Sequence, residues 1–199
     1  MWVQTGILLI WICVLTGTPS IQEANNELYS DPEAYAVYAA VLPKVWNWDQ
    51  RMQTLVVFLQ ETKRARLNSA KDLGIEGDRR FARDWSDTLE NYVKNNRTVK
   101  RLQRKFPIAM DYVLVPTEEV NALFHAGGWA NFYHHYPRAV NYVSMSAVGF
   151  NKEKTQALVT MTYTCGSACA GGRYYFLVKR NGKWVEADLR NVSVPAWAS

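Results

Sequence analysis

The chain has 199 residues, which suits one domain, and its 48% hydrophobic and 21% charged residues are the balance of an ordinary globular protein. This composition excludes a disordered or low-complexity chain, and the sequence contains no internal repeat. The net charge of +5 and the isoelectric point near 9.1 allow weak attraction to anionic surfaces, but they do not identify a nucleic-acid or lipid partner.

The N-terminal segment predicts export. Residues 1–20 carry no charge, and an unbroken apolar run extends from Ile7 to Leu15. Such a run fits the hydrophobic region of a signal peptide and is too short to span a bilayer. We therefore expect residues 1–20 to be the signal peptide of a periplasmic or secreted protein, and residues 21–199 to form its single domain. The alternatives are an uncleaved N-terminal anchor and a buried element of a cytosolic fold.

Residues 30–125 are expected to form the helical part of the domain. Ser30 or Asp31 can cap a first helix, which Pro43 ends. Large apolar side chains repeat at helical spacing over residues 81–93 and predict an amphipathic helix.

Two short strands and one more helix are expected within this helical part. The apolar runs at residues 55–59 and 112–115 are typical of strands. Thr117 can cap a helix that follows Pro116, and the Gly127-Gly128 pair ends it.

Residues 140–190 are expected to form the sheet part. Residues 142–150, 155–164, 173–180 and 183–189 each predict a strand. Asn181-Gly182 is a two-residue hairpin signal that requires positive φ at both positions. Short turns between sequential strands indicate antiparallel pairing. The predicted class is α+β, with N-terminal helices packed on a C-terminal antiparallel β-meander.

The cysteines favour a disulfide. Cys13 lies in the predicted leader, which leaves Cys165 and Cys169 as an even pair in an exported chain. We expect these two to be joined as a clip on a hairpin. The alternatives are a redox dithiol, and a nucleophilic Cys165 that works with His134 or His135.

Several short segments resemble a family of exported bacterial proteins of unknown function. They are Ser144–Phe150, Gln156–Val159, Cys165-Gly166, Cys169–Gly172 and Lys179–Trp184. The similarity covers roughly residues 110–190. The resemblance implies a bacterial, non-cytoplasmic setting and carries no activity over to this chain.

A basic stretch over residues 94–105 is the most charged feature of the chain. It predicts a second short helix, because apolar residues alternate with the basic ones at spacings of three and four. The cations could contact phosphate or anionic lipid, or they could simply form a solvated helix face. These candidate anion contacts are Lys94, Arg97, Lys100, Arg101, Arg104 and Lys105.

An aromatic and histidine-rich segment is the candidate binding surface, with a role in the core as the alternative. Its residues are Trp129, Phe132, Tyr133, His134, His135 and Tyr136. The histidines form no recognisable metal-ligand set, so neither a metal site nor a cofactor is predicted. Glu186 and Asp188 are expected on one face of the last strand, where a solvated face is favoured over a catalytic pair.

The sequence therefore favours a non-enzymatic exported protein, a binding or envelope-associated module with no assigned catalytic residue. The candidate partners are an envelope component, a glycan or an anionic lipid, and nucleic acid is excluded by the expected compartment. One alternative is a small thiol-dependent enzyme or hydrolase that uses Cys165 with His134 or His135. The other is a membrane-peripheral protein that uses residues 94–105.

Overall fold

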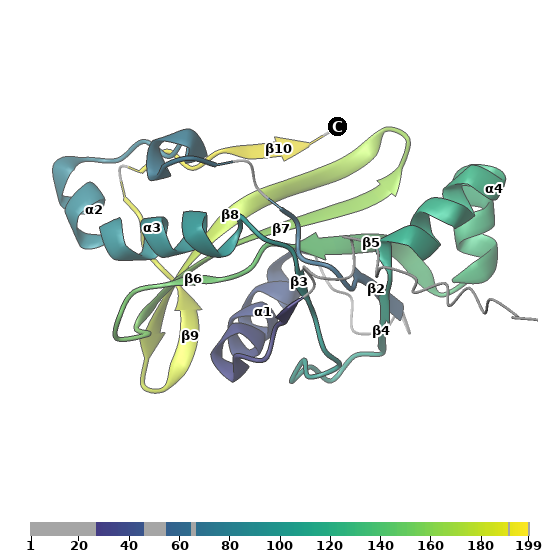
Figure 1. The fold of residues 1–199 in the computed structure, drawn as a ribbon, viewed down its shortest axis with the longest axis horizontal. Coiled ribbons are helices and arrows are strands. Elements are labelled where there is room, and N and C mark those ends of the chain that lie inside the picture. Colours follow the sequence, from purple (N-terminus) through teal and green to yellow (C-terminus); the bar gives the residue numbers. More distant parts are fainter. Residues whose placement is uncertain (1–26, 46–54, 65–66, 191, 199) are drawn as a thin grey trace, which may run out of the picture.

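A computed structural model describes residues 27–45, 55–64, 67–190 and 192–198 (Figure 1). Cys13 and the predicted leader at residues 1–20 lie outside the described residues. Among the residues that are described, no helix has the length and apolar character needed to cross a membrane.

A mixed sheet organises the described part of the chain. Its strands are β2 (Leu55–Leu59), β4 (Tyr112–Val115), β5 (Ala139–Met145), β6 (Gly149–Phe150), β7 (Gln156–Gly166), β8 (Cys169–Arg180), β9 (Lys183–Glu186) and β10 (Ala196–Ala198). They follow the order β10-β8-β7-β5-β2-β4, with β6 pairing β7 and β9 pairing β8. Two further short strands, β1 (Glu27–Leu28) and β3 (Lys100–Arg101), pair in parallel outside this sheet.

The α+β class is confirmed, but the sheet is larger than a C-terminal meander. The pairs β5–β7, β7–β8 and β8–β9 are antiparallel, whereas β2 pairs in parallel with both β4 and β5. The apolar run of β2 explains this position, because Val56 and Phe58 face one core cluster and Val57 faces another. A strand that is buried on both faces has a continuous apolar run in place of alternation, and such runs are typical of parallel strands.

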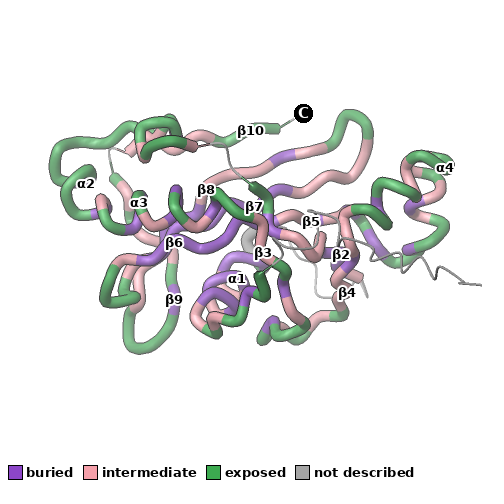
Figure 2. Tube along the Cα trace, viewed as in Figure 1, coloured by how far each residue is buried: buried purple, intermediate pink, exposed green. Residues whose placement is uncertain are grey.

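Helices cover both faces of the sheet. The helix α1 (Pro32–Val45) packs on one face, where Tyr38 and Val41 meet Val143 and Val159 in the main core. On the opposite face, α2 (Arg79–Asp84) and α3 (Ser86–Asn95) cover β7 and β8 through contacts with Leu158 and Phe176, beside the 3-10 helix η2 (Ala70–Leu73). The helix α4 (Thr117–His135) covers the β2 end of that same face. Figure 2 shows the buried segments concentrated where these helices meet the sheet.

The predicted short helix in the basic stretch is wrong. Residues 100–101 form β3, and the Leu102 amide donates to the Gln60 carbonyl while the Thr62 amide donates to the Lys100 carbonyl. Leu102 and Phe106 are both buried in the main core. The apolar spacing therefore reflects an extended segment held by tertiary pairing, which overrides the local helical pattern.

The other differences lie at element boundaries. The first helix continues past Pro43 to Val45. The helix predicted to end at Gly127-Gly128 instead kinks there, since both glycines have non-helical backbone angles, and it resumes to His135. The predicted strand over residues 142–150 is divided into β5 and β6. The Asn181-Gly182 turn is confirmed, with φ angles of 50° and 75°.

Candidate functional site

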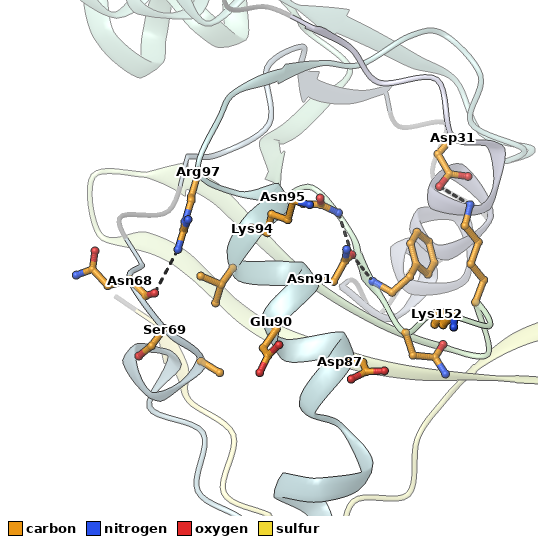
Figure 3. Close-up of a pocket in the computed structure, with 15 residues that line it drawn as sticks. Asp31, Asn68, Ser69, Asp87, Glu90, Asn91, Lys94, Asn95, Arg97 and Lys152 are labelled. Carbon is orange, nitrogen blue, oxygen red and sulfur yellow. Dashed lines mark hydrogen bonds and ion pairs between the residues drawn. The ribbon is translucent and has the colours of Figure 1, made fainter.

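A polar groove of about 760 Å³ lies along the outer side of α3 (Figure 3). Four segments form it: the exposed side of α3, residues 68–70 at the start of η2, residues 150–154 at and after the end of β6, and Asp31 just before α1. The charged and polar side chains that matter most for its chemistry are Asp87, Glu90, Lys94, Arg97 and Lys152. We refer to this feature as the polar groove.

Asparagine side chains of α3 hold one wall of the polar groove. The Phe150 amide donates to Asn91 Oδ1 over 2.9 Å, and Asn95 Nδ2 donates to the same oxygen and to the Val148 carbonyl. Asn96 acts as both donor and acceptor for the backbone of Ala147, at 2.9 and 2.8 Å. These side chains take the place of a neighbouring strand and fix the 147–150 segment against the helix.

Hydrogen bonds also fix the opposite wall. The amides of Asn68 and Ser69 donate to Asp72 Oδ2 at 2.7 and 3.0 Å, and these bonds hold the pKa of Asp72 below its ordinary value. Arg97 Nη2 donates to the Asn68 carbonyl over 3.3 Å and so ties this wall to the end of α3. The shape of the polar groove is therefore set before any ligand arrives.

The polar groove presents charges of both signs. Within the described residues, Asp87, Glu90, Lys94 and Lys152 make no side-chain hydrogen bond or ion pair. By contrast, Lys154 at the rim pairs with Asp31 over 2.8 Å. Uncompensated charges of opposite sign that line a fixed groove are suited to a polar ligand that carries both charges.

The structure divides the predicted anion-contact stretch. Lys94 and Arg97 line the polar groove. Lys100 pairs instead with Glu27 over 2.6 Å, and this bond lowers the pKa of the Glu27 carboxyl. Arg104 lies 5.2 Å from the centre of the Tyr112 ring. The remaining two members, Arg101 and Lys105, are exposed.

The aromatic segment is largely packed against the sheet. Phe132 and Tyr136 are buried in the core beneath α4. Trp129 is half-buried and stacks on Tyr142, and Tyr133 donates to the carbonyl of Cys165 over 2.8 Å. Phe132 and Tyr136 thus have almost no surface to offer a ligand.

The histidines of this segment remain at the surface. His134 and His135 are exposed, and His135 Nε2 lies 3.9 Å from Glu119 Oε1. The same carboxylate accepts a hydrogen bond from Tyr136, and burial together with this carboxylate raises the pKa of the Tyr136 hydroxyl. Within the described residues, no group of three or more potential ligands could hold a metal ion.

The predicted disulfide is confirmed. Cys165 and Cys169 are joined across the tip of the β7–β8 hairpin, with their Cα atoms 5.1 Å apart. The predicted carboxylate pair on the last strand is not present, because β9 ends at Glu186. Glu186 pairs with Arg173 over 3.4 Å, and Asp188 beyond the strand pairs with Arg190.

Sequence reasoning missed most of the polar groove. Asp87 and Glu90 lie three positions apart on the polar side of the predicted helix, and this spacing was the available signal. Lys152 comes from a distant turn, so no local pattern places it beside them. Comparisons with protein-family models, curated proteins and solved structures find no match for this chain. The site is therefore interpreted from its own geometry.

Proposed function

We propose that this protein is a non-enzymatic exported binding module of the cell envelope, and that the polar groove is its ligand site. The observation that carries the proposal is the set of four charged side chains, two of each sign, that have no partner among the described residues and line a groove with fixed walls. Binding at such a site costs little reorganisation of the protein.

The charge pattern favours a ligand with both amino and acidic groups. A simple anion would meet Asp87 and Glu90, and a simple cation would meet Lys94, Arg97 and Lys152. A ligand of mixed charge can satisfy both sets at once. Soluble disaccharide-peptide fragments of a bacterial cell wall belong to this class, because they carry carboxylates, amines and sugar hydroxyls.

The disulfide and the leader support an extracytoplasmic location. Disulfides persist in oxidising compartments and are rare in the cytosol. The charge-free segment 1–20 provides a signal peptide or anchor for reaching such a compartment. The resemblance to exported bacterial proteins supports the same setting.

The proposal also includes the finer architecture expected from the sequence, N-terminal helices packed on the C-terminal antiparallel meander.

The two alternative functions have weaker support. A thiol-dependent enzyme needs a free thiolate, and Cys165 is bonded to Cys169. The membrane-peripheral alternative would use Arg101, Arg104 and Lys105, which are exposed outside the polar groove. Its contact surface is therefore separable from the groove by mutation.

A titration monitored by NMR tests the proposal. The ¹⁵N-labelled, oxidised protein is titrated with a purified disaccharide-tripeptide from cell wall and, separately, with phosphatidylglycerol vesicles. We expect saturable shifts at Asp87, Glu90 and Lys94 with the first probe, and a loss of affinity of about tenfold or more in Glu90→Lys and Lys94→Glu.

Matched variants control for nonspecific charge effects. Glu118→Lys and Lys183→Glu make the same charge changes at exposed positions elsewhere, and they should leave the affinity unchanged. The absence of shifts along α3 would contradict the proposal. Vesicle binding that Arg104→Glu abolishes, without any groove binding, would favour the membrane-peripheral alternative.

A further inference from the structure

A second cavity, of about 250 Å³, lies where β7, β8 and β10 meet at the edge of the sheet. Side chains of Met161, Tyr163, Arg173 and Tyr175 line it, all from the sheet face that α1 covers elsewhere. We refer to it as the edge pocket. It lies on the face opposite to α3, so the inference below does not depend on the polar groove.

Two glycines let aromatic rings lie against the backbone at the edge pocket. A Cβ atom at Gly171 would lie 2.7 Å from the Tyr163 hydroxyl oxygen, and one at Gly172 would lie 2.5 Å from the Trp197 ring. Neither position could therefore hold a side chain without displacing an aromatic ring. The glycine pair keeps the floor of the edge pocket at backbone level between two rings that pack from opposite faces.

Arg173 is held in place by two contacts. Its guanidinium carbon lies 4.3 Å from the centre of the Tyr175 ring, and its Nη2 lies 3.4 Å from Glu186 Oε1. Below it, Met161 and Tyr175 are buried in the main core and give the pocket a rigid base. The arrangement places hydrogen-bond donors of Arg173 beside a carboxylate acceptor, next to the half-buried ring of Tyr163.

The geometry points to a binding site for one neutral sugar ring. The apolar C–H face of a pyranose would pack on Tyr163, and a ring hydroxyl would accept a hydrogen bond from Arg173. Because Glu186 already compensates the charge of Arg173, an anionic ligand gains little there. The volume is below the range of about 300–1,000 Å³ typical of larger ligands, which suits a single ring.

Titration of the full, oxidised protein with simple glycosides tests this site. The neutral probes are the methyl glycosides of glucose, galactose, mannose and N-acetylglucosamine, and methyl glucuronide is the anionic probe. We expect at least one neutral glycoside to give saturable NMR shifts at Tyr163, Arg173 and Ala196, with affinity of roughly 1 mM. Failure of all neutral probes, or tighter binding of the glucuronide, would overturn the inference.

Variants locate the binding. Tyr163→Ala and Arg173→Met should each weaken it at least tenfold. Thr164→Ala changes the neighbouring residue on the opposite face, and Arg180→Met changes an exposed arginine at the end of the same strand, so both should bind normally.

A variant that fills the edge pocket provides a second test in case Tyr163→Ala or Arg173→Met fails to fold. Ala196 is exposed on β10 and lines the edge pocket, so Ala196→Trp should block the cavity while the unfolding midpoint is retained. Persistent glycoside binding in folded Ala196→Trp would rule this pocket out as the site.

Discussion

At the scale of single residues, the three asparagines at the end of α3 form hydrogen bonds to backbone groups of residues 147–150 that a neighbouring strand would otherwise form. Asn91 and Asn95 bond to Phe150 and Val148, and Asn96 bonds to Ala147 through both its donor and its acceptor. Asn96 is completely buried, although it begins an Asn-X-Thr glycosylation pattern. Its position in the core explains why a polar residue is required there and why a glycan would not fit.

Replacing Asn96 should lower the stability of the folded protein considerably. Asn96→Ala leaves the N–H and C=O of Ala147 without partners in the interior, and each such group costs about 1–3 kcal/mol. We expect the free energy of unfolding, measured in urea, to fall by about 2–6 kcal/mol. The matched change Asn68→Ala, at an exposed residue whose hydrogen bonds to other described residues use only its backbone atoms, should change it by less than about 0.5 kcal/mol. Equal effects in the two variants would contradict this account of α3.

Glu33 should give stability that depends on pH. Its carboxylate accepts hydrogen bonds from Lys179 and Trp184, and the bond from Lys179 is the main cause that lowers its pKa below the ordinary 4.5. A lowered pKa in the folded state means that the stabilisation is present above pH 4.5 and is lost as the pH falls through the folded pKa.

The measurement compares Glu33→Gln with the wild type in urea at several pH values. At pH 7 the variant should be less stable by about 1 kcal/mol, since the pair is partly exposed. This gap should shrink as the pH is lowered below 4.5. The control Glu118→Gln, at an exposed residue in the first turn of α4 without an ion pair among the described residues, should show a smaller gap at pH 7, because only the weaker attraction to the helix N-terminus is lost. A gap at Glu33 that stays constant with pH would be evidence against a charged role.

At the scale of elements, the kink in α4 depends on one glycine more than on the other. Gly128 has φ 63° and ψ −144°, a region that other residues rarely adopt, whereas Gly127 has φ 173°, which is extended backbone. A Cβ at Gly127 would meet the Asn131 Cβ at 3.1 Å, and a Cβ at Gly128 would have open space. The cost at Gly128 is therefore conformational.

We expect Gly128→Ala to lower the free energy of unfolding by about 1–3 kcal/mol. Gly127→Ala should cost less, because a small shift of Asn131 relieves its contact. Thermal unfolding followed by circular dichroism measures both. A larger loss in Gly127→Ala than in Gly128→Ala would show that the kink has a different cause.

The disulfide at the hairpin tip should make a modest contribution to the free energy of unfolding. Closing the short loop from Cys165 to Cys169 lowers the entropy of the unfolded chain, which raises its free energy by about 2 kcal/mol. We expect the double variant Cys165→Ser, Cys169→Ser to remain folded, because β7 and β8 pair along most of their length. Its midpoint in urea should match that of the reduced wild type, and a clear difference between them would mean that the serines disturb the hairpin.

Element prediction succeeded where local chemistry decides the structure. Positive φ at Asn181 and Gly182 follows from the turn type, and the apolar stripe over residues 81–93 is helical, although Trp85 divides the predicted single helix into α2 and α3. It failed where distant pairing decides. Nothing near residues 97–106 shows that their backbone bonds to Gln60 and Thr62, and nothing near β2 shows that it lies between β4 and β5.

The same reasoning explains what could be foreseen of the candidate site. Lys94 and Arg97 stand out as charges in sequence, so they were identified. Asp87 and Glu90 looked like an ordinary solvated helix face. Lys152 joins them only because Asn91 and Asn95 hold the turn after β6 against α3. The polar groove is thus a product of tertiary structure, and a local pattern contains only part of it.

At the scale of the whole molecule, the two sheet faces have different surroundings. The polar groove lies on the α3 side and has mixed, uncompensated charge, whereas the edge pocket lies on the α1 side with an aromatic ring and a paired arginine. If both bind, one protein can hold two different ligands at once. Groove variants should then weaken the binding of the disaccharide-peptide and leave that of the neutral glycoside unchanged, and pocket variants should do the reverse, as expected for separate sites.

The proposed function depends on the chain reaching an oxidising compartment, where the two late cysteines are joined. The most direct measurement is to recover the protein from fractionated native cells and to alkylate it under denaturing, non-reducing conditions before mass spectrometry. The prediction is recovery outside the cytoplasm, with Cys165 and Cys169 protected from the reagent. Recovery from the cytosol with both cysteines alkylated would contradict it.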